Sequence, residues 1–128
     1  MSDDKKPRPN VVIDLDTGAE ETILLAAHYD VVPAGTGWKL SPFKMEVVGD
    51  RAYGRGTSDD KGAIVAALCA MKEISQVKSK VNLSFLVTPD EEVGGRLGLG
   101  YLVNEIGITG DAAVILINKF NCIETYSC

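Results

Sequence analysis

Three apolar or nearly all-apolar runs constrain the fold of this chain more than any other feature of its sequence. They cover residues 22–27, 81–87 and 112–117, and each has the length of a strand; the run at 81–87 is interrupted only by Asn82 and Ser84. Such runs are typical of strands covered on both faces of a sheet. Helical spacing of apolar residues separates them, at 64–71 and 99–106. The order predicts an α/β fold: a three-layer, mostly parallel (mixed) sheet with helices on both faces.

Local signals add detail to this prediction. An alternating segment at 11–15 indicates a further strand, and Gly49-Asp50 indicates a hairpin between 44–48 and 51–53. The helix around 64–71 is apolar almost all round, so we expect it to be deeply buried, with Ser58 or Asp59 as its N-cap. Gly107 is the expected C-cap of the helix around 99–106.

Composition and length bound the function classes. The 128 residues are most simply one domain, divided here into a solvated tail (1–10), a folded part (11–117) and a tail without clear periodicity (118–128). A formal net charge of −5 argues against nucleic acid or an anionic membrane as a partner. No apolar run reaches the length of about 18 residues that spans a bilayer. Three cysteines without a CxxC pair suggest neither a disulfide framework nor a thiolate zinc site, so a cytoplasmic location is expected.

Polar clusters stand where the buried segments end or begin. His28-Tyr29-Asp30 follows the run at 22–27, and Asp90-Glu91-Glu92 follows the run at 81–87. Asp59 comes after a glycine-rich loop, at the start of the helix around 64–71. Open α/β sheets place their sites at the carboxyl ends of the strands, so we expect these clusters to meet. Because residues two apart in an extended chain point the same way, Asp30 can accept a hydrogen bond from one ring nitrogen of His28 and leave the other for a metal.

The ligand set that these clusters offer contains nitrogen and oxygen but no sulfur. It suits a catalytic zinc, manganese or cobalt ion better than a structural zinc. Plainer interpretations exist for each cluster taken alone. The His28 and Asp30 pair can be a structural hydrogen bond, Asp59 can be an N-cap, and Glu91-Glu92 can be a solvated loop. The coincidence of all three clusters at one edge of one sheet favours the metal site.

The strings themselves carry a resemblance. They are Leu-Ala-Ala-His28-Tyr-Asp30-Val-Val-Pro, Tyr-Gly-Arg-Gly-Thr-Ser-Asp59-Asp-Lys-Gly and Thr-Pro-Asp-Glu91-Glu92-Val-Gly-Gly, with Trp38 and Pro42-Phe43 between the first two. Between about Val11 and Ala113 the chain resembles the zinc-dependent family of acetylornithine deacetylase, succinyl-diaminopimelate desuccinylase, aminoacylase and the carboxypeptidase G-type exopeptidases. The match covers only the N-terminal part of that family's catalytic domain, so the expected fold is a truncated zinc-exopeptidase-like one.

The resemblance implies a role for each residue. His28, Asp59 and Glu92 are the implied metal ligands, with Asp59 bridging two zinc ions. Glu91 is the implied general base, and Asp30 the catalytic-site residue that orients His28. The implied substrate is a small N-acyl amino acid or a peptide with a free carboxylate. The implied reaction is metal-dependent hydrolysis of its amide bond, as in a deacylase or exopeptidase.

The chain also departs from the family pattern. Family members carry a further acidic ligand after the strand that matches 112–117, where this chain has Ile117, and the nearest later acid is Glu124. They also use a second histidine, whereas His28 is the only one here. Each of two zinc ions would then keep two ligands. The alternative function is therefore an inactive truncated fragment that binds metal weakly or associates with an intact relative. An exposed sheet edge would favour a homo-oligomer, and the unrelated end after Ile117 suggests a truncation or a shifted reading frame.

Overall fold

The computed structural model describes residues 7–117 and the backbone of 124–127. The elements, in chain order, are β1 (Val11–Leu15), β2 (Thr22–His28), β3 (Glu46–Val48), β4 (Arg51–Tyr53), α1 (Lys61–Ile74), β5 (Asn82–Thr88), the 3₁₀ turn η1 (Glu91–Val93), α2 (Leu99–Tyr101), its π-helical continuation η2 (Leu102–Ile106), β6 (Ala112–Ile115) and β7 (Glu124–Ser127). Among the described residues, no helix is long and apolar enough to cross a membrane.

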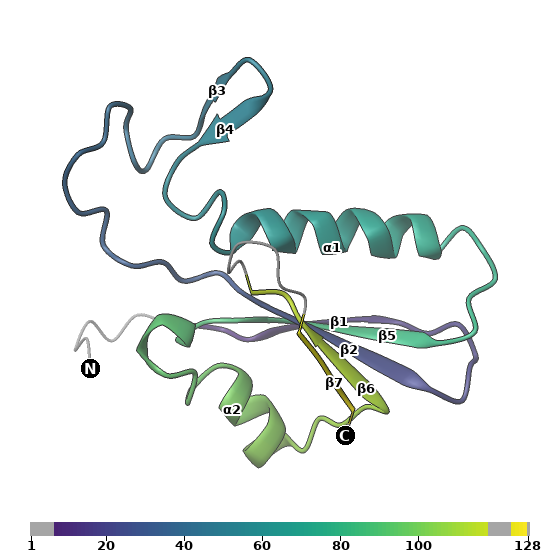
Figure 1. Cartoon of the computed structure of the whole chain (residues 1–128). Coiled ribbons are helices and arrows are strands. Elements are labelled where there is room, and N and C mark those ends of the chain that lie inside the picture. The colour runs from purple at the N-terminus through teal and green to yellow at the C-terminus, as the bar shows by residue number, and fades with distance from the viewer. Residues whose placement is uncertain (1–6, 118–123, 128) are drawn as a thin grey trace.

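Five strands form one mixed sheet in the order β1-β5-β2-β6-β7. The three apolar runs supply its centre, where β2 pairs in parallel with both β5 and β6. The outer strands β1 and β7 run antiparallel to their neighbours. Figure 1 shows α1 across one face of this sheet and α2 across the other. The predicted three-layer α/β fold is therefore confirmed.

The core explains why the central strands lack polar alternation. Phe85 and Leu86 are neighbours on β5, and both are completely buried. Phe85 packs in the cluster on the α1 side with Met71, whereas Leu86 packs in the other cluster with Ala26 and Leu102. Because successive side chains of a strand point to opposite faces, a strand between two helical layers needs apolar side chains on both faces.

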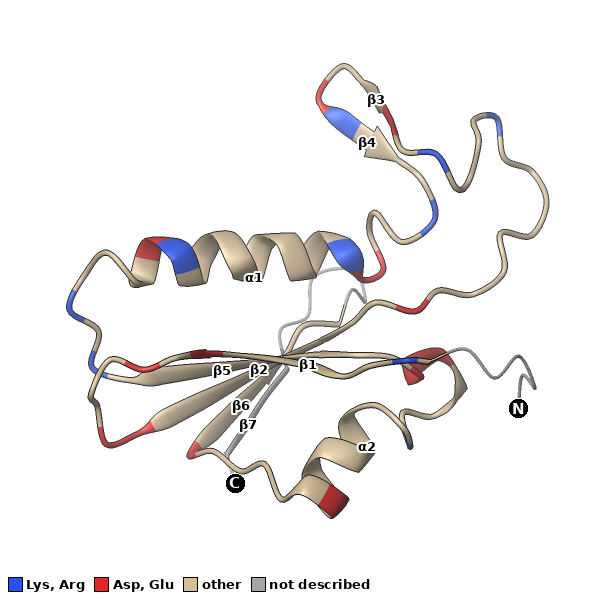
Figure 2. Cartoon of the chain, turned by 180° about the vertical axis from the view of Figure 1, so that it is seen from behind, with Lys and Arg blue, Asp and Glu red and all other residues tan. Residues whose placement is uncertain are grey.

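Helix α1 differs from its prediction in two respects. Of its residues only Ala67 and Met71 are buried, while Val65 is 59% exposed. Figure 2 shows charged residues only at the two ends of the helix, so its outward face is apolar. The expectation of deep burial was wrong because the sheet lies on one side of α1 only. The N-cap is Asp60 rather than Ser58 or Asp59, and its side chain makes no cap hydrogen bond.

The last described strand was not expected from the sequence. β7 pairs antiparallel with β6, with Ala112 opposite Ser127 and Ile115 opposite Glu124. The β6 edge is therefore not open, and the edges of the sheet are β1 and β7. Residues 118–123 lie outside the described part, so the predicted boundary at 117 stays a prediction. The predicted hairpin is confirmed as β3–β4, which stands away from the sheet (Figure 1).

Candidate metal centre

The parallel pairing of β2 and β5 brings two of the polar clusters together. His28 is the last residue of β2 and lies opposite Thr88, the last residue of β5. The backbone N–H of Tyr29 donates to the Thr88 carbonyl at 2.9 Å and extends this pairing by one residue. The chain after His28 and the chain after Thr88 therefore leave the sheet side by side.

The imidazole of His28 is held on both sides. Its side chain is only 4% exposed, and Nδ1 lies 3.2 Å from the backbone oxygen of Asp30 and 3.3 Å from its carboxylate. Nε2 lies 3.1 Å from Oδ1 of Asp59. Two acceptors at Nδ1 favour a proton on that nitrogen, which leaves the lone pair of a neutral ring on Nε2. Nε2 is therefore the nitrogen available to a metal.

Asp30 makes further contacts that its sequence position did not reveal. Its carboxylate accepts the backbone N–H of Glu91 at 3.3 Å and that of Glu92 at 3.2 Å. One side chain thus contacts the His28 ring and fixes the start of the η1 turn. Sequence reasoning predicted only the contact with His28, because the pairing of two loops 61 residues apart has no local signal.

The glycine-rich loop places Asp59 and Asp60 in different environments. The Asp59 side chain is 53% exposed and faces His28. Asp60 is completely buried, and its Oδ2 accepts the backbone N–H of His28 at 3.2 Å. Gly62 allows this close packing, since a Cβ on it would collide with the carbonyl oxygen of Thr57. Asp60 therefore joins the start of α1 to the end of β2, a role that sequence reasoning missed.

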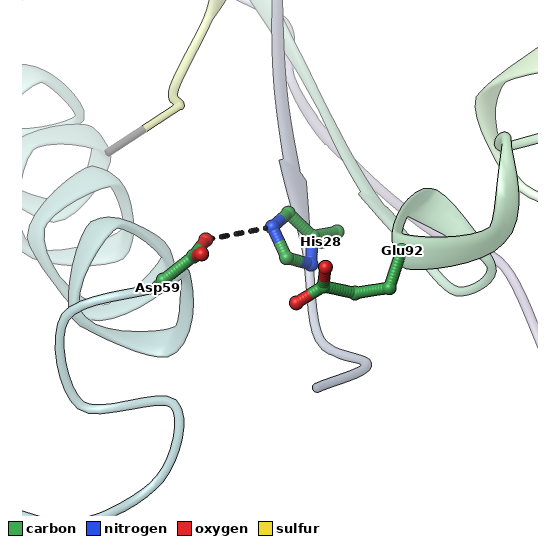
Figure 3. A group of neighbouring side chains, drawn as sticks. All are labelled: His28, Asp59 and Glu92. Carbon is green, nitrogen blue, oxygen red and sulfur yellow. Dashed lines mark hydrogen bonds and ion pairs between the residues drawn. The ribbon is translucent and has the colours of Figure 1, made fainter. Parts of the chain in front are cut away.

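The three predicted ligands converge in the structure. One donor atom from each of His28, Asp59 and Glu92 lies within 4.8 Å of the other two, and Figure 3 shows the three side chains approaching from three elements. Glu91 extends toward the same place, with an oxygen 3.8 Å from Nε2 of His28. Asp90 turns elsewhere, because its carboxylate accepts the N–H of Leu97 at 3.1 Å.

The charges around His28 shift two pKa values. Burial lowers the pKa of the His28 imidazole, but the carboxylates of Glu91, Asp60 and Asp30 and the hydrogen bond to Asp59 outweigh it, so the pKa is raised above 6.5. Burial, with the nearby negative charges of Asp59 and Glu91, raises the pKa of Asp60 to about 6, although the His28 N–H and the His28 charge oppose the shift. In the metal-free protein, the negative charges around the candidate metal site therefore favour the protonated forms of His28 and Asp60.

The donor set fits a divalent ion of the zinc type. One imidazole nitrogen and two carboxylate oxygens match the ligands of catalytic zinc sites, which use three protein ligands and leave one position open. The 3.1 Å between Nε2 and Asp59 Oδ1 is close to the spacing of about 3.3 Å between two ligand atoms of a tetrahedral zinc. His28 is thus oriented from Nδ1 in the manner usual for metal-bound histidines.

A pocket opens beside this cluster. It has a volume of about 350 Å³, and His28 and Glu91 form its polar wall. The remaining wall is mostly apolar and comes from β2, α2 and the end of β6, including Leu99, Ile115 and Ile117. A small substrate could therefore reach Glu91 from this side. Ile117, which stands where family members are expected to carry a further acidic ligand, lies in the same wall.

Known proteins with similar sequences share this region. The family model described as Peptidase family M20/M25/M40 matches residues 24–124. An uncharacterized metallohydrolase from Methanococcus maripaludis is 40% identical over 123 residues, which are 91% of this chain and 30% of that protein. A succinyl-diaminopimelate desuccinylase from Novosphingobium aromaticivorans is 42% identical over 93 residues, which are 70% of this chain and 24% of that protein.

Solved structures agree with the sequence comparison. The M20 family metallo-carboxypeptidase Sso-CP2 from Sulfolobus solfataricus has a TM-score of 0.74 and 32% identity, over 84% of this chain and 26% of that one. Human carnosine dipeptidase 1 has a TM-score of 0.69 and 28% identity, over 86% of this chain and 25% of that one.

The fold and these comparisons agree on one family of proteins. The chain belongs to the M20/M25/M40 peptidase family. It spans less than a third of the length of the relatives described above.

Proposed function

We propose that this chain carries the metal-binding part of a hydrolase that cleaves the amide bond of a small N-acyl amino acid or peptide. The observation that carries the proposal is the meeting of one donor atom each from His28, Asp59 and Glu92 within 4.8 Å, with a Glu91 oxygen 3.8 Å from Nε2 of His28. A three-ligand centre beside a further carboxylate is the arrangement expected for metal-assisted hydrolysis.

His28, Asp59 and Glu92 would hold the metal, which is zinc by family, with cobalt or manganese as substitutes. When bound, a divalent ion polarises a carbonyl and lowers the pKa of water. By the family resemblance, Asp59 would be shared if two zinc ions were bound. The three converging side chains are the donors that the described residues supply for that arrangement.

Glu91 is proposed as the general base. Its side chain is 48% exposed and borders the pocket, so it can reach both water and a bound substrate. It would take a proton from the attacking water and deliver it to the leaving amine, a proton transfer worth about 10²- to 10⁴-fold in rate. Asp30 would position the groups on both sides of the site. Its carboxylate contacts the His28 ring and accepts the N–H groups of Glu91 and Glu92.

The names of the relatives suggest the substrate class. They include a succinyl-diaminopimelate desuccinylase, a metallo-carboxypeptidase and a dipeptidase. All three names describe cleavage of an amide bond in a small molecule or at a chain end. We therefore propose small N-acyl amino acids and dipeptides as substrates of this site.

The second candidate function is a fragment without catalysis. The observation that favours it is coverage, because this chain spans only 24–30% of relatives such as those from Novosphingobium and Methanococcus. In this form the chain would bind metal weakly or associate with an intact relative. Its apolar face on α1 offers a surface for such an association.

Hydrolysis of N-acetylornithine, N-succinyl amino acids and simple dipeptides by the purified chain separates the two functions. The assay is run with added zinc or cobalt and repeated for Glu91→Gln. An active chain should show metal-dependent turnover that falls at least about 100-fold in Glu91→Gln while its bound metal stays the same. Equal rates in both proteins would remove Glu91 from the mechanism. No turnover with metal bound would support the fragment.

A further inference from the structure

We infer that the metal site of this chain binds one ion, which His28, Asp59 and Glu92 coordinate together, rather than two ions that share Asp59. The inference rests on the proposed metal-binding function but concerns the number of ions and the ligand set. It follows from a count of donor atoms that the structure brings within reach of one another.

The count begins with the three donors. Among the described residues, His28, Asp59 and Glu92 form the one group of potential ligands whose donor atoms all lie within 4.8 Å of one another. A catalytic zinc normally takes three protein ligands, so this group is sufficient for one ion. Two ions with a shared bridging carboxylate would need about five donor groups.

The neighbouring carboxylates are committed to other contacts. The oxygens of Asp30 accept the N–H groups of Glu91 and Glu92, and one of them faces Nδ1 of His28. Asp60 is completely buried with its Oδ2 on the His28 N–H. If either carboxylate moved to a second ion, the end of β2 and the η1 turn would lose the bonds that position the first three donors.

The pocket wall supplies no further donor on the β6 side. Ile117 lines the pocket together with His28 and Glu91, and its side chain has no atom that can bind a metal. The sequence also contains one histidine in total, so no second imidazole is available anywhere in the chain. With Glu91 assigned to proton transfer in the proposed function, one nitrogen and two carboxylates remain as the ligand set among the described residues.

The spacing of the donors supports a single centre. Nε2 of His28 and Oδ1 of Asp59 are already 3.1 Å apart, which is about the separation of two ligands on one tetrahedral ion. Glu92 approaches from the opposite side of the ring from Asp59 (Figure 3). Its donor oxygen lies within 4.8 Å of those of the other two residues, and rotation of its flexible side chain can shorten that spacing.

Metal stoichiometry tests the inference directly. The purified chain is dialysed against buffered free zinc over a range that reaches saturation, and bound zinc is measured by mass spectrometry. A parallel titration with cobalt follows the visible absorption of the bound ion. We expect one zinc per chain and a cobalt signal that stops rising at one equivalent. Saturation at two ions per chain would overturn the inference.

Three variants test the ligands, and a fourth is their control. His28→Asn, Asp59→Asn and Glu92→Gln should each weaken cobalt binding by more than about tenfold and change the cobalt spectrum. Glu73→Gln, on the exposed far end of α1, is the matched control and should leave both unchanged. Circular dichroism checks that each variant is folded. Unchanged binding in folded Glu92→Gln or Asp59→Asn would show that the three donors do not share one ion.

Glu124→Gln provides a further check, since Glu124 is the nearest acid after Ile117 in the sequence. The inference expects no change in stoichiometry or affinity, and a loss of the ion would overturn the ligand set. The readings also separate this inference from the proposed function. One bound ion without hydrolysis supports the inference and contradicts the function, whereas two ions with hydrolysis do the reverse. Absence of saturable binding would contradict both.

Discussion

The backbone N–H of His28 donates to the buried carboxylate of Asp60 at 3.2 Å. This single bond joins the last residue of β2 to the first turn of α1. It also places Asp59, the neighbour of Asp60, against the His28 ring, where the two side chains are 3.1 Å apart. The geometry of the candidate metal centre therefore depends on a carboxylate that is not among the proposed ligands.

Replacement of Asp60 by Asn should change how stability depends on pH in the metal-free protein. The pKa of Asp60 is raised from 3.8 to about 6, so the folded chain holds this proton more tightly than the unfolded chain. The free energy of unfolding should therefore fall as pH rises from about 4 to above 6, by up to about 3 kcal/mol from this group. Asp60→Asn cannot ionise and should lose that part of the slope, as measured by urea unfolding at several pH values.

The control for this prediction is Asp50→Asn at the hairpin tip, where the Asp50 side chain is 96% exposed. It should keep the wild-type slope. The raised pKa of His28 has the same sign, because its protonated form is favoured in the folded state and stability is lost as pH rises through that pKa. Some slope should therefore persist in Asp60→Asn. A slope identical to that of the wild type would show that Asp60 does not titrate in this range.

Truncation of Asp30 should weaken metal binding through the residues it positions. Asp30→Ala removes the acceptor of the Glu91 and Glu92 N–H groups and the carboxylate beside His28 Nδ1. We expect a loss of about 10- to 100-fold in cobalt affinity, as is usual for groups that orient metal ligands. Asp30→Asn keeps one acceptor oxygen, so its cobalt affinity should lie between those of the wild type and Asp30→Ala.

Asp111→Ala is a matched control for Asp30→Ala. Asp111 accepts the backbone N–H of Thr22 at 2.7 Å, at the opposite end of β2 from His28. The Asp111→Ala substitution removes a similar hydrogen bond from the same strand and should leave the cobalt affinity unchanged. Equal losses in the two variants would indicate a general effect on the sheet rather than positioning of the ligands.

The sequence predicted the sheet and the meeting of its polar clusters at one edge because their signals are local. Continuous apolar runs identify central strands, and the polar residues that follow them identify the edge where a site forms. The role of Asp60 could not be predicted in this way. In the sequence it is the second of two adjacent acids, and only the packing of α1 against β2 shows that it is buried on the His28 N–H while Asp59 faces the ring.

The errors also have physical causes. The segment 64–71 is apolar on all sides, which normally indicates burial on all sides. In this chain the sheet covers one side of α1 and Val65 remains exposed. β7 was missed because the sequence after Ile117 has no period of its own. β7 is held by its pairing with β6, a partner that a search for local patterns does not include.

Replacement of Gly62 by Ala should destabilise the chain even though Gly62 lies in a helix. Alanine is favoured over glycine inside a helix by about 1 kcal/mol. At this position, however, a Cβ would collide with the carbonyl oxygen of Thr57, in the loop that carries Asp59. We expect a net loss of about 1–3 kcal/mol in urea unfolding, together with weaker cobalt binding. Gly54→Ala meets only ordinary contacts near 3.4 Å and serves as the control. A gain in stability for Gly62→Ala would contradict the close contact.

Charged substitutions on the outward face of α1 should reduce self-association without unfolding the chain. Val65 and Leu68 are 59% and 39% exposed, so replacing both with glutamate removes little buried apolar area. The free energy of unfolding should change by less than about 1 kcal/mol, whereas Met71→Ala on the buried face should cost about 2–5 kcal/mol. Exposed apolar patches promote association, so sedimentation should show fewer oligomers in the double glutamate variant than in the wild type. A large loss of stability in that variant would mean that this face is covered in solution. In that case the sheet-and-helix unit would depend on a second layer of protein over α1, which is the behaviour expected of a fragment that functions in association with a larger relative.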